Sequence, residues 1–303
     1  MPRCKPVASI PLLLSFVLLA SCMAKGQHNT SNAPSGLTNP PERIVSLAPA
    51  TTSIIIALNA TDRLVGVDSW SAKTHKIPST IPQFDLIRPD AETLMALEPD
   101  VILLSSLTGE GKPEESLSPL IQRGIKIEIF HTSENLADVF ADIQRIADLL
   151  GYSSKGQDLV HRLTDEVEAI RASGAAIPEE QRKTVYFELS PAPALYSFGS
   201  GVYLDELLSI AGAHNCLADK TGWLAISAEE ILARSPDVIL TNTAFIDDPV
   251  HEILSRPGWT HIPAVQNHAV YKIDSNASSQ PGPDVLVALR EIYKAVYPNG
   301  TTP

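Results

Sequence analysis

The sequence has little of what several protein classes require. It contains three cysteines, Cys4, Cys22 and Cys216, and 23 basic against 35 acidic residues, which gives a formal net charge of −12. Such acidity argues against nucleic-acid binding and against adhesion to an anionic membrane through a basic patch. The apolar run near the N-terminus, from Ile10 to Ala20, is shorter than the roughly 20 residues that a membrane-spanning helix needs.

Common catalytic motifs are also missing. Ser200 lies between adjacent glycines, Gly199 and Gly201, and not in the Gly-x-Ser-x-Gly pattern of hydrolases. The stretch from Gly109 to Lys112 is too short for a phosphate-binding loop, and neither Cys-x-x-Cys nor His-Glu-x-x-His occurs. We therefore expect a protein that binds and does not catalyse, with no cofactor of its own.

The N-terminus indicates where the protein works. Arg3 and Lys5 precede the apolar run, which ends in small residues directly before Cys22, so residues 1–21 are expected to form a signal peptide. The Leu-Ala-Ser-Cys sequence resembles the bacterial lipoprotein box, in which the cysteine becomes diacylated after cleavage. Two acyl chains on Cys22 would anchor the protein stably to a bacterial membrane, on its periplasmic or cell-surface side.

The segment after Cys22, residues 22–40, is polar and is expected to be a flexible tether. Removal of the signal takes away two positive charges and Cys4, so the mature chain would carry a net charge of about −14. Cys216 then has no partner for an intramolecular disulfide.

A sequence block occurs twice. Residues 91–103 read AETLMALEPDVIL and residues 228–240 read AEEILARSPDVIL, with eight identities and no gap. Each copy predicts a short helix, a Pro-Asp turn and a buried strand. The repetition indicates two lobes built alike, with Glu92 and Glu229 at equivalent places, an arrangement that suits a two-fold symmetric partner. The alternative is that helix-turn-strand units resemble each other by chance.

Strands and helices alternate along the rest of the chain, which predicts an α/β fold with mainly parallel sheets. We expect two similar lobes, residues 41–150 and 179–303, with a ligand cleft between them. In the connecting region, residues 151–178, a single long helix over Ser154–Ala172 has one apolar face, formed by Leu159, Leu163, Val167 and Ile170. One helical connector is stiff, so domain closure should be small.

Several stretches, in their order and spacing, resemble the class III substrate-binding proteins of ABC importers, which serve vitamin B12, ferric siderophores and haem. They are Pro41–Thr52, Leu64–Val67, Ala91–Leu103, Phe198–Leu208, Gly222–Glu230 and Gln280–Pro283. The resemblance implies a monomer that docks on a homodimeric permease with a cytoplasmic ATPase. It further implies that Glu92 and Glu229 engage basic pockets of that permease. Alternatively, both are simply carboxylates favoured at a helix N-terminus.

Ligands of open α/β sheets bind outside the carboxyl ends of the strands. Five aromatic residues are expected there in loops, together with Pro49, which lies at the start of the first helix. They are Trp70, Phe84, Tyr196, Phe198 and Trp223. Such a lining suits a large flat ligand such as a corrin, a porphyrin or an aryl chelate. Each aromatic residue could instead belong to the core.

The charge of the ligand is less definite. Gln280 stands where many siderophore binders of this family place an arginine, and Asp284 stands where another arginine is common. These departures favour a corrinoid, a cobalt-containing ligand. Arg88 and Lys112 could still supply cations to a ferric siderophore or haem.

His131 follows a predicted strand and could ligate the metal of a chelate, or be an exposed loop residue. A bare Zn²⁺ or Mn²⁺ site is a weaker alternative, because His75, His131 and His268 do not form a His-rich loop. No protein-held metal is therefore expected.

Overall fold

The computed structural model describes residues 39–298. The predicted signal peptide, Cys22 and nearly all of the predicted tether lie outside these residues. Within the described part, no helix combines the length and the apolar character needed to cross a bilayer.

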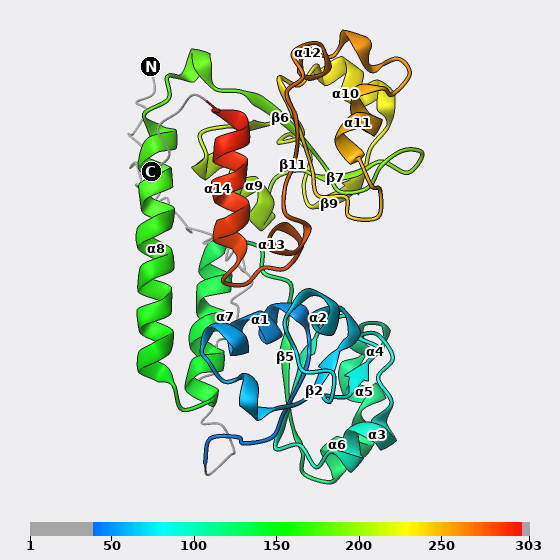
Figure 1. The fold of residues 1–303 in the computed structure, drawn as a ribbon, viewed down its shortest axis with the longest axis vertical. Coiled ribbons are helices and arrows are strands. Elements are labelled where there is room, and N and C mark those ends of the chain that lie inside the picture. Colours follow the sequence, from blue (N-terminus) through cyan, green and yellow to red (C-terminus); the bar gives the residue numbers. More distant parts are fainter. Residues whose placement is uncertain (1–38, 299–303) are drawn as a thin grey trace, which may run out of the picture. The chain divides into compact units, whose positions relative to one another are not determined.

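The N-terminal lobe, in the lower half of Figure 1, is built on a five-stranded parallel sheet. Its strand order is β3-β2-β1-β4-β5. The strands are β1 (Ile44–Leu47), β2 (Leu64–Asp68), β3 (Gln83–Phe84), β4 (Val101–Ser105) and β5 (Lys126–Phe130). The helices are α1 (Pro49–Ala57), η1 (Thr61–Arg63), α2 (Ser69–Thr74), α3 (Ala91–Ala96), α4 (Thr108–Gly111), α5 (Pro113–Ser116), α6 (Ser118–Gln122) and α7 (Leu136–Leu149).

Both faces of this sheet are covered, which explains the continuous apolar runs of its central strands. Ile44 and Leu103 pack in one apolar cluster with α1 and α7. Val45 and Ile102, one position away along each strand, pack in a second cluster with α3 and α6. Successive side chains along each strand thus point to opposite faces of the sheet and pack in two separate apolar clusters.

The C-terminal lobe contains a four-stranded parallel sheet with the order β11-β10-β6-β8. Its strands are β6 (Thr184–Glu188), β8 (His214–Asn215), β10 (Val238–Thr241) and β11 (Val270–Lys272), and β7 (Tyr196–Phe198) pairs with β9 (Trp223–Ala225) in a separate antiparallel ribbon. The helices are η2 (Glu179–Gln181), α9 (Tyr203–Ile210), α10 (Ala228–Arg234), α11 (Pro249–Leu254), η3 (Trp259–His261), α12 (Pro263–Gln266), α13 (Ser275–Ser279) and α14 (Val285–Val296).

The repeated block forms the same unit in both lobes. The first copy is α3 followed by β4 next to β1, and the second is α10 followed by β10 next to β6. The Asp100 carboxylate accepts the backbone N–H of Arg43 at 2.9 Å, just before β1, and Asp237 accepts that of Thr184 at 2.9 Å, at the start of β6. The strand orders β2-β1-β4-β5 and β8-β6-β10-β11 correspond. The prediction of two similar lobes is confirmed.

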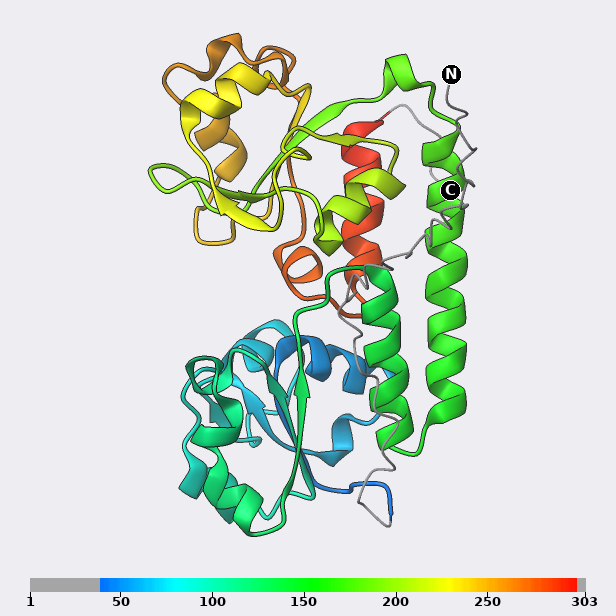
Figure 2. The same cartoon turned by 180° about the vertical axis from the view of Figure 1, so that it is seen from behind.

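The linking helix is α8 (Ser153–Ala175), slightly longer at both ends than expected. Figures 1 and 2 show it beside α7 in one half and α14 in the other, and it also contacts α9. A Cβ on Gly156 would lie 2.4 Å from Ala147 Cβ of α7, and one on Gly174 would lie 2.3 Å from the Ile210 carbonyl oxygen of α9. Glycine at both ends therefore lets α8 pack directly against a neighbouring helix in each lobe.

Candidate ligand-binding site

A cavity of about 540 Å³ lies where strands of both lobes end. The N-terminal lobe contributes residues of α2, which follows β2. The C-terminal lobe contributes one residue after β10, the last residue of β11 with those that follow it, and one residue of α14. The lining residues are Trp70, Thr74, Ala244, Lys272, Ile273, Asp274, Ser275, Asn276 and Glu291. This is the position at which parallel sheets commonly bind ligands.

Four of the eight large apolar side chains that are exposed within residues 39–298 follow the carboxyl ends of parallel strands. Trp70 (44% exposed), Ile87 (37%), Leu107 (56%) and Phe245 (74%) each lie within a few residues of the carboxyl end of a parallel strand. Large apolar side chains left in water at one part of a molecule mark a binding surface. The sequence analysis identified Trp70 but missed the other three.

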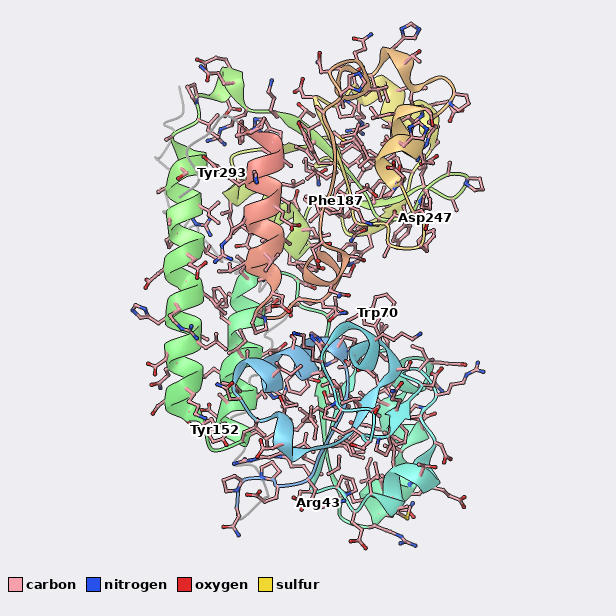
Figure 3. All side chains as sticks on the ribbon, viewed as in Figure 1. Arg43, Trp70, Tyr152, Phe187, Asp247 and Tyr293 are labelled. Atoms are coloured by element: carbon pink, nitrogen blue, oxygen red, sulfur yellow. The ribbon has the colours of Figure 1, made fainter. Side chains whose placement is uncertain are left out.

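Trp70 is held in place by the residue that ends β2. The buried Asp68 caps α2, and its carboxylate accepts the backbone N–H groups of Trp70 at 3.0 Å and Ser71 at 2.8 Å. Burial raises the pKa of Asp68, and these hydrogen bonds act in the opposite direction. Trp70 was expected in a loop, but it lies in the first turn of α2 (Figure 3), where the Asp68 cap fixes its backbone.

The other aromatic residues near the strand ends form a layered group on the β7–β9 ribbon and not in loops. Phe198 is fully buried, and Trp223 packs edge-on against it with ring centroids 5.9 Å apart. Tyr203 of α9 supports Trp223 in the same way at 6.0 Å. Trp223 remains 38% exposed and Tyr196 40% exposed. The ribbon therefore leaves Tyr196 and Trp223 partly exposed, whereas Phe198 is buried against Trp223.

Phe84 also differs from the expectation. It is 5% exposed and packs with Leu94 in the second apolar cluster of the N-terminal lobe. Its ring lies 2.9 Å from the place where Gly66 would carry a Cβ. In this structure Phe84 and Phe198 are buried in the core, whereas Trp70, Tyr196 and Trp223 are exposed.

Pro49 and Gln280 lie outside the cavity lining. Pro49 is the first residue of α1 and is partly exposed. Gln280 is 8% exposed, and its Nε2 has no hydrogen-bond partner among the described residues. Nearby, a Cβ on Gly282 would lie 2.5 Å from Ser53 Oγ of α1, so this segment packs closely against the N-terminal lobe.

A family model described as "Periplasmic binding protein" matches residues 44–277. The chain belongs to the periplasmic binding protein family. It is 27% identical to the uncharacterized ABC transporter substrate-binding lipoprotein YvrC of Bacillus subtilis, over 95% of this chain and 96% of YvrC. It is 25% identical to the vitamin B12-binding protein of Vibrio parahaemolyticus, over 84% of this chain and 88% of that protein.

Solved structures show the same relationship. The periplasmic haem-binding protein HutB of Vibrio cholerae superposes with a TM-score of 0.74 and 28% identity, over 84% of this chain and 99% of HutB. The recognition of the chain as an ABC-type substrate-binding protein with two α/β lobes and a long helix is therefore confirmed.

In this binding protein, Glu92 and Glu229 occupy matching places. Each is exposed and is the second residue of its helix, α3 or α10. Each helix is capped by the residue two positions earlier, where Asp90 accepts the Thr93 N–H at 3.0 Å and Ser227 accepts the Glu230 N–H at 3.2 Å. The two carboxylates are thus presented in the same way on the two lobes.

The cations expected for the cleft are already paired. Arg88 forms an ion pair with Glu110, and Lys112 Nζ lies 3.2 Å from a Glu115 carboxylate oxygen. The cation that lines the cavity is Lys272, and neither Arg88 nor Lys112 lines it. The sequence analysis did not identify Lys272. Its place as the last residue of β11 is the sequence signal that could have identified it.

His131 is exposed directly after β5. Among residues 39–298, no three His, Cys, Asp or Glu side chains gather as a metal site would require.

Proposed function

We propose that this periplasmic binding protein captures a corrinoid and delivers it to an ABC importer. The observation that carries the proposal is the set of exposed aromatic side chains on regular elements: Trp70 on α2, which lines the cavity, and Tyr196 and Trp223 on the β7–β9 ribbon of the other lobe. A large flat ligand gains most from such surfaces through area burial and stacking. The similarity to a vitamin B12-binding protein supports the corrinoid as the ligand.

Haem or a ferric siderophore is the second candidate. The similarity to the haem-binding HutB favours haem, and the exposed phenol of Tyr196 and imidazole of His131 are groups that ligate haem iron. A corrinoid and haem share a flat macrocycle, so the aromatic surfaces alone do not choose between them.

A direct titration separates these candidates. The purified protein is titrated with cyanocobalamin, haemin and two ferric siderophores while its tryptophan fluorescence is followed, with calorimetry to confirm each affinity. The chain has three tryptophans, and Trp259 is buried at 1% exposure. Quenching that is lost in Trp70→Phe therefore reports on the cavity, and quenching that is lost in Trp223→Phe reports on the ribbon. Saturable binding of cyanocobalamin alone supports the proposal, and binding of haemin alone replaces the corrinoid with haem.

We propose further that Glu92 and Glu229 dock on the permease and that diacylated Cys22 tethers the protein outside the cytoplasmic membrane. The matching presentation of the two carboxylates supports the first idea. The Leu-Ala-Ser-Cys sequence and the similarity to a named lipoprotein support the second.

Docking is tested by the double variant Glu92→Gln with Glu229→Gln. It should bind ligand as the wild type does and lose most uptake, because charge pairing at the interface is removed. The exposed pair Glu114→Gln with Glu180→Gln removes the same charge elsewhere and should keep uptake. Equal uptake by both double variants would refute the docking role.

A further inference from the structure

Lys272 is the only cation among the residues that line the cavity, and it is exposed at the end of β11. None of the ion pairs within residues 39–298 includes it. Arg88 and Lys112, by contrast, each have a glutamate partner. An ammonium group without a protein counter-ion, beside a cavity, is suited to bind an acidic group of a ligand.

The two carboxylates that line the same cavity are engaged by the backbone. Asp274 caps α13, and its Oδ1 accepts the Ala277 N–H at 2.8 Å. Glu291 of α14 accepts the Asp274 N–H at 2.7 Å. Both side chains therefore stabilise the turn that follows β11. Neither is among the ion pairs of residues 39–298.

The opposite lobe supplies an apolar surface to the same cavity. Trp70 extends from α2 with 44% of its surface exposed, and Thr74 lies one turn further along that helix. An aromatic surface on one lobe and an unpaired ammonium on the other match a ligand that is flat and apolar over most of its area and acidic at its edge.

We propose that Lys272 is a specificity-determining residue that binds an acidic substituent of a macrocyclic tetrapyrrole ligand whose body lies against Trp70. The proposal rests on the proposed function and deepens it. The acidic substituent is a carboxylate if the ligand is a porphyrin and a phosphodiester if it is a corrinoid. Both are oxyanions that accept a charge-assisted hydrogen bond from an ammonium group.

The test compares each acidic ligand with a close relative that lacks the acid. The full-length protein, its Lys272→Gln variant and a Lys73→Gln control are titrated with haemin, haemin dimethyl ester, cyanocobalamin and dicyanocobinamide. The ester lacks free carboxylates, and the cobinamide lacks the phosphodiester. Lys73 is an exposed residue of α2 that precedes Thr74 and does not line the cavity, so its variant removes the same charge from a nearby position.

For the pair of ligands that binds, Lys272→Gln should lower the affinity for the acidic ligand by about 10-fold or more, because the charge-assisted hydrogen bond is lost. The affinity for the ligand without the acid should stay within about 2-fold of the wild type. The Lys73→Gln variant should match the wild type for all probes. The pair that responds identifies the acid as carboxylate or phosphodiester.

An equal loss for both members of the pair, or no loss for either, would overturn the role of Lys272 and leave the proposed function intact. If the wild type binds none of the four probes, both the role of Lys272 and the tetrapyrrole ligand are wrong.

Discussion

Replacing Trp223 with alanine should weaken ligand binding by about 8- to 60-fold. A tryptophan side chain can bury up to about 250 Å², and Trp223 is 38% exposed. The ligand can therefore cover at most about 95 Å² of it, worth about 2.4 kcal/mol at roughly 25 cal/mol per Å². If the ligand covers only half of that area, the loss is about 1.2 kcal/mol. Every 1.4 kcal/mol or so corresponds to a tenfold change in affinity, so these two energies give the lower and upper limits of the expected weakening.

Calorimetric titration of the ligand identified by fluorescence provides the assay. Trp223 packs on Phe198 and Tyr203, so thermal unfolding must show that the variant is folded at the titration temperature. The control is Ile121→Ala, which truncates a similarly exposed side chain (43%) on α6 of the N-terminal lobe and not on the ribbon. A folded Trp223→Ala protein with less than about a 2-fold change in affinity would refute the placement of ligand against the ribbon.

Three predictions concern stability and are checked by urea unfolding. Burial raises the pKa of Asp142 to about 6 from its usual value of 3.8, so the native state binds this proton more tightly and stability should rise as the pH falls from about 6 to 4. Asp142→Asn should flatten this dependence and raise the free energy of unfolding by about 1–2 kcal/mol at pH 7.5. This is less than the roughly 3 kcal/mol that the full pKa shift corresponds to, because the carboxyl group is partly solvated. An unchanged pH profile of stability would contradict the assignment to Asp142. Glu98 (φ 45°) and Ser235 (φ 46°) occupy the same left-handed backbone position in the two copies of the repeat. Changing either residue to glycine should stabilise the protein by about 0.5–1 kcal/mol, because glycine adopts this conformation without strain. Lower stability of both variants would show that neither position is strained. Gly174→Ala should destabilise by about 2–3 kcal/mol, because the new methyl meets backbone atoms of Ile210 and Gly212, and a neutral effect would mean that α8 shifts freely.

The sequence predicted the fold well because the repeated block contains its own boundaries. A carboxylate at the helix start, the Pro-Asp turn and a run of Val, Ile and Leu specify where each element begins and ends. Asp100 and Asp237 also tie each unit to the neighbouring central strand, which is why the two copies adopt one topology.

The candidate site was less predictable because local pattern does not say how far a side chain lies from the core. Tyr196 and Phe198 are two positions apart on β7 and so share a face, yet one is 40% exposed and the other fully buried. Phe84 lies on a short edge strand, where only its packing against Leu94 reveals that it is internal. Lys272 has no motif at all, and its importance follows from a cavity that both lobes create.

The glycines at the two ends of α8 have a further consequence. Because the backbone of α8 packs against α7 at one end and against α9 at the other, the length of α8 sets the distance between the two lobes. Substitutions at strand ends, by contrast, need not change the packing of α8. Such positions include Trp70, Phe245 and Lys272. Ligand preference could therefore change through these residues while the separation between Glu92 and Glu229, the two residues proposed to dock on a permease, stays the same.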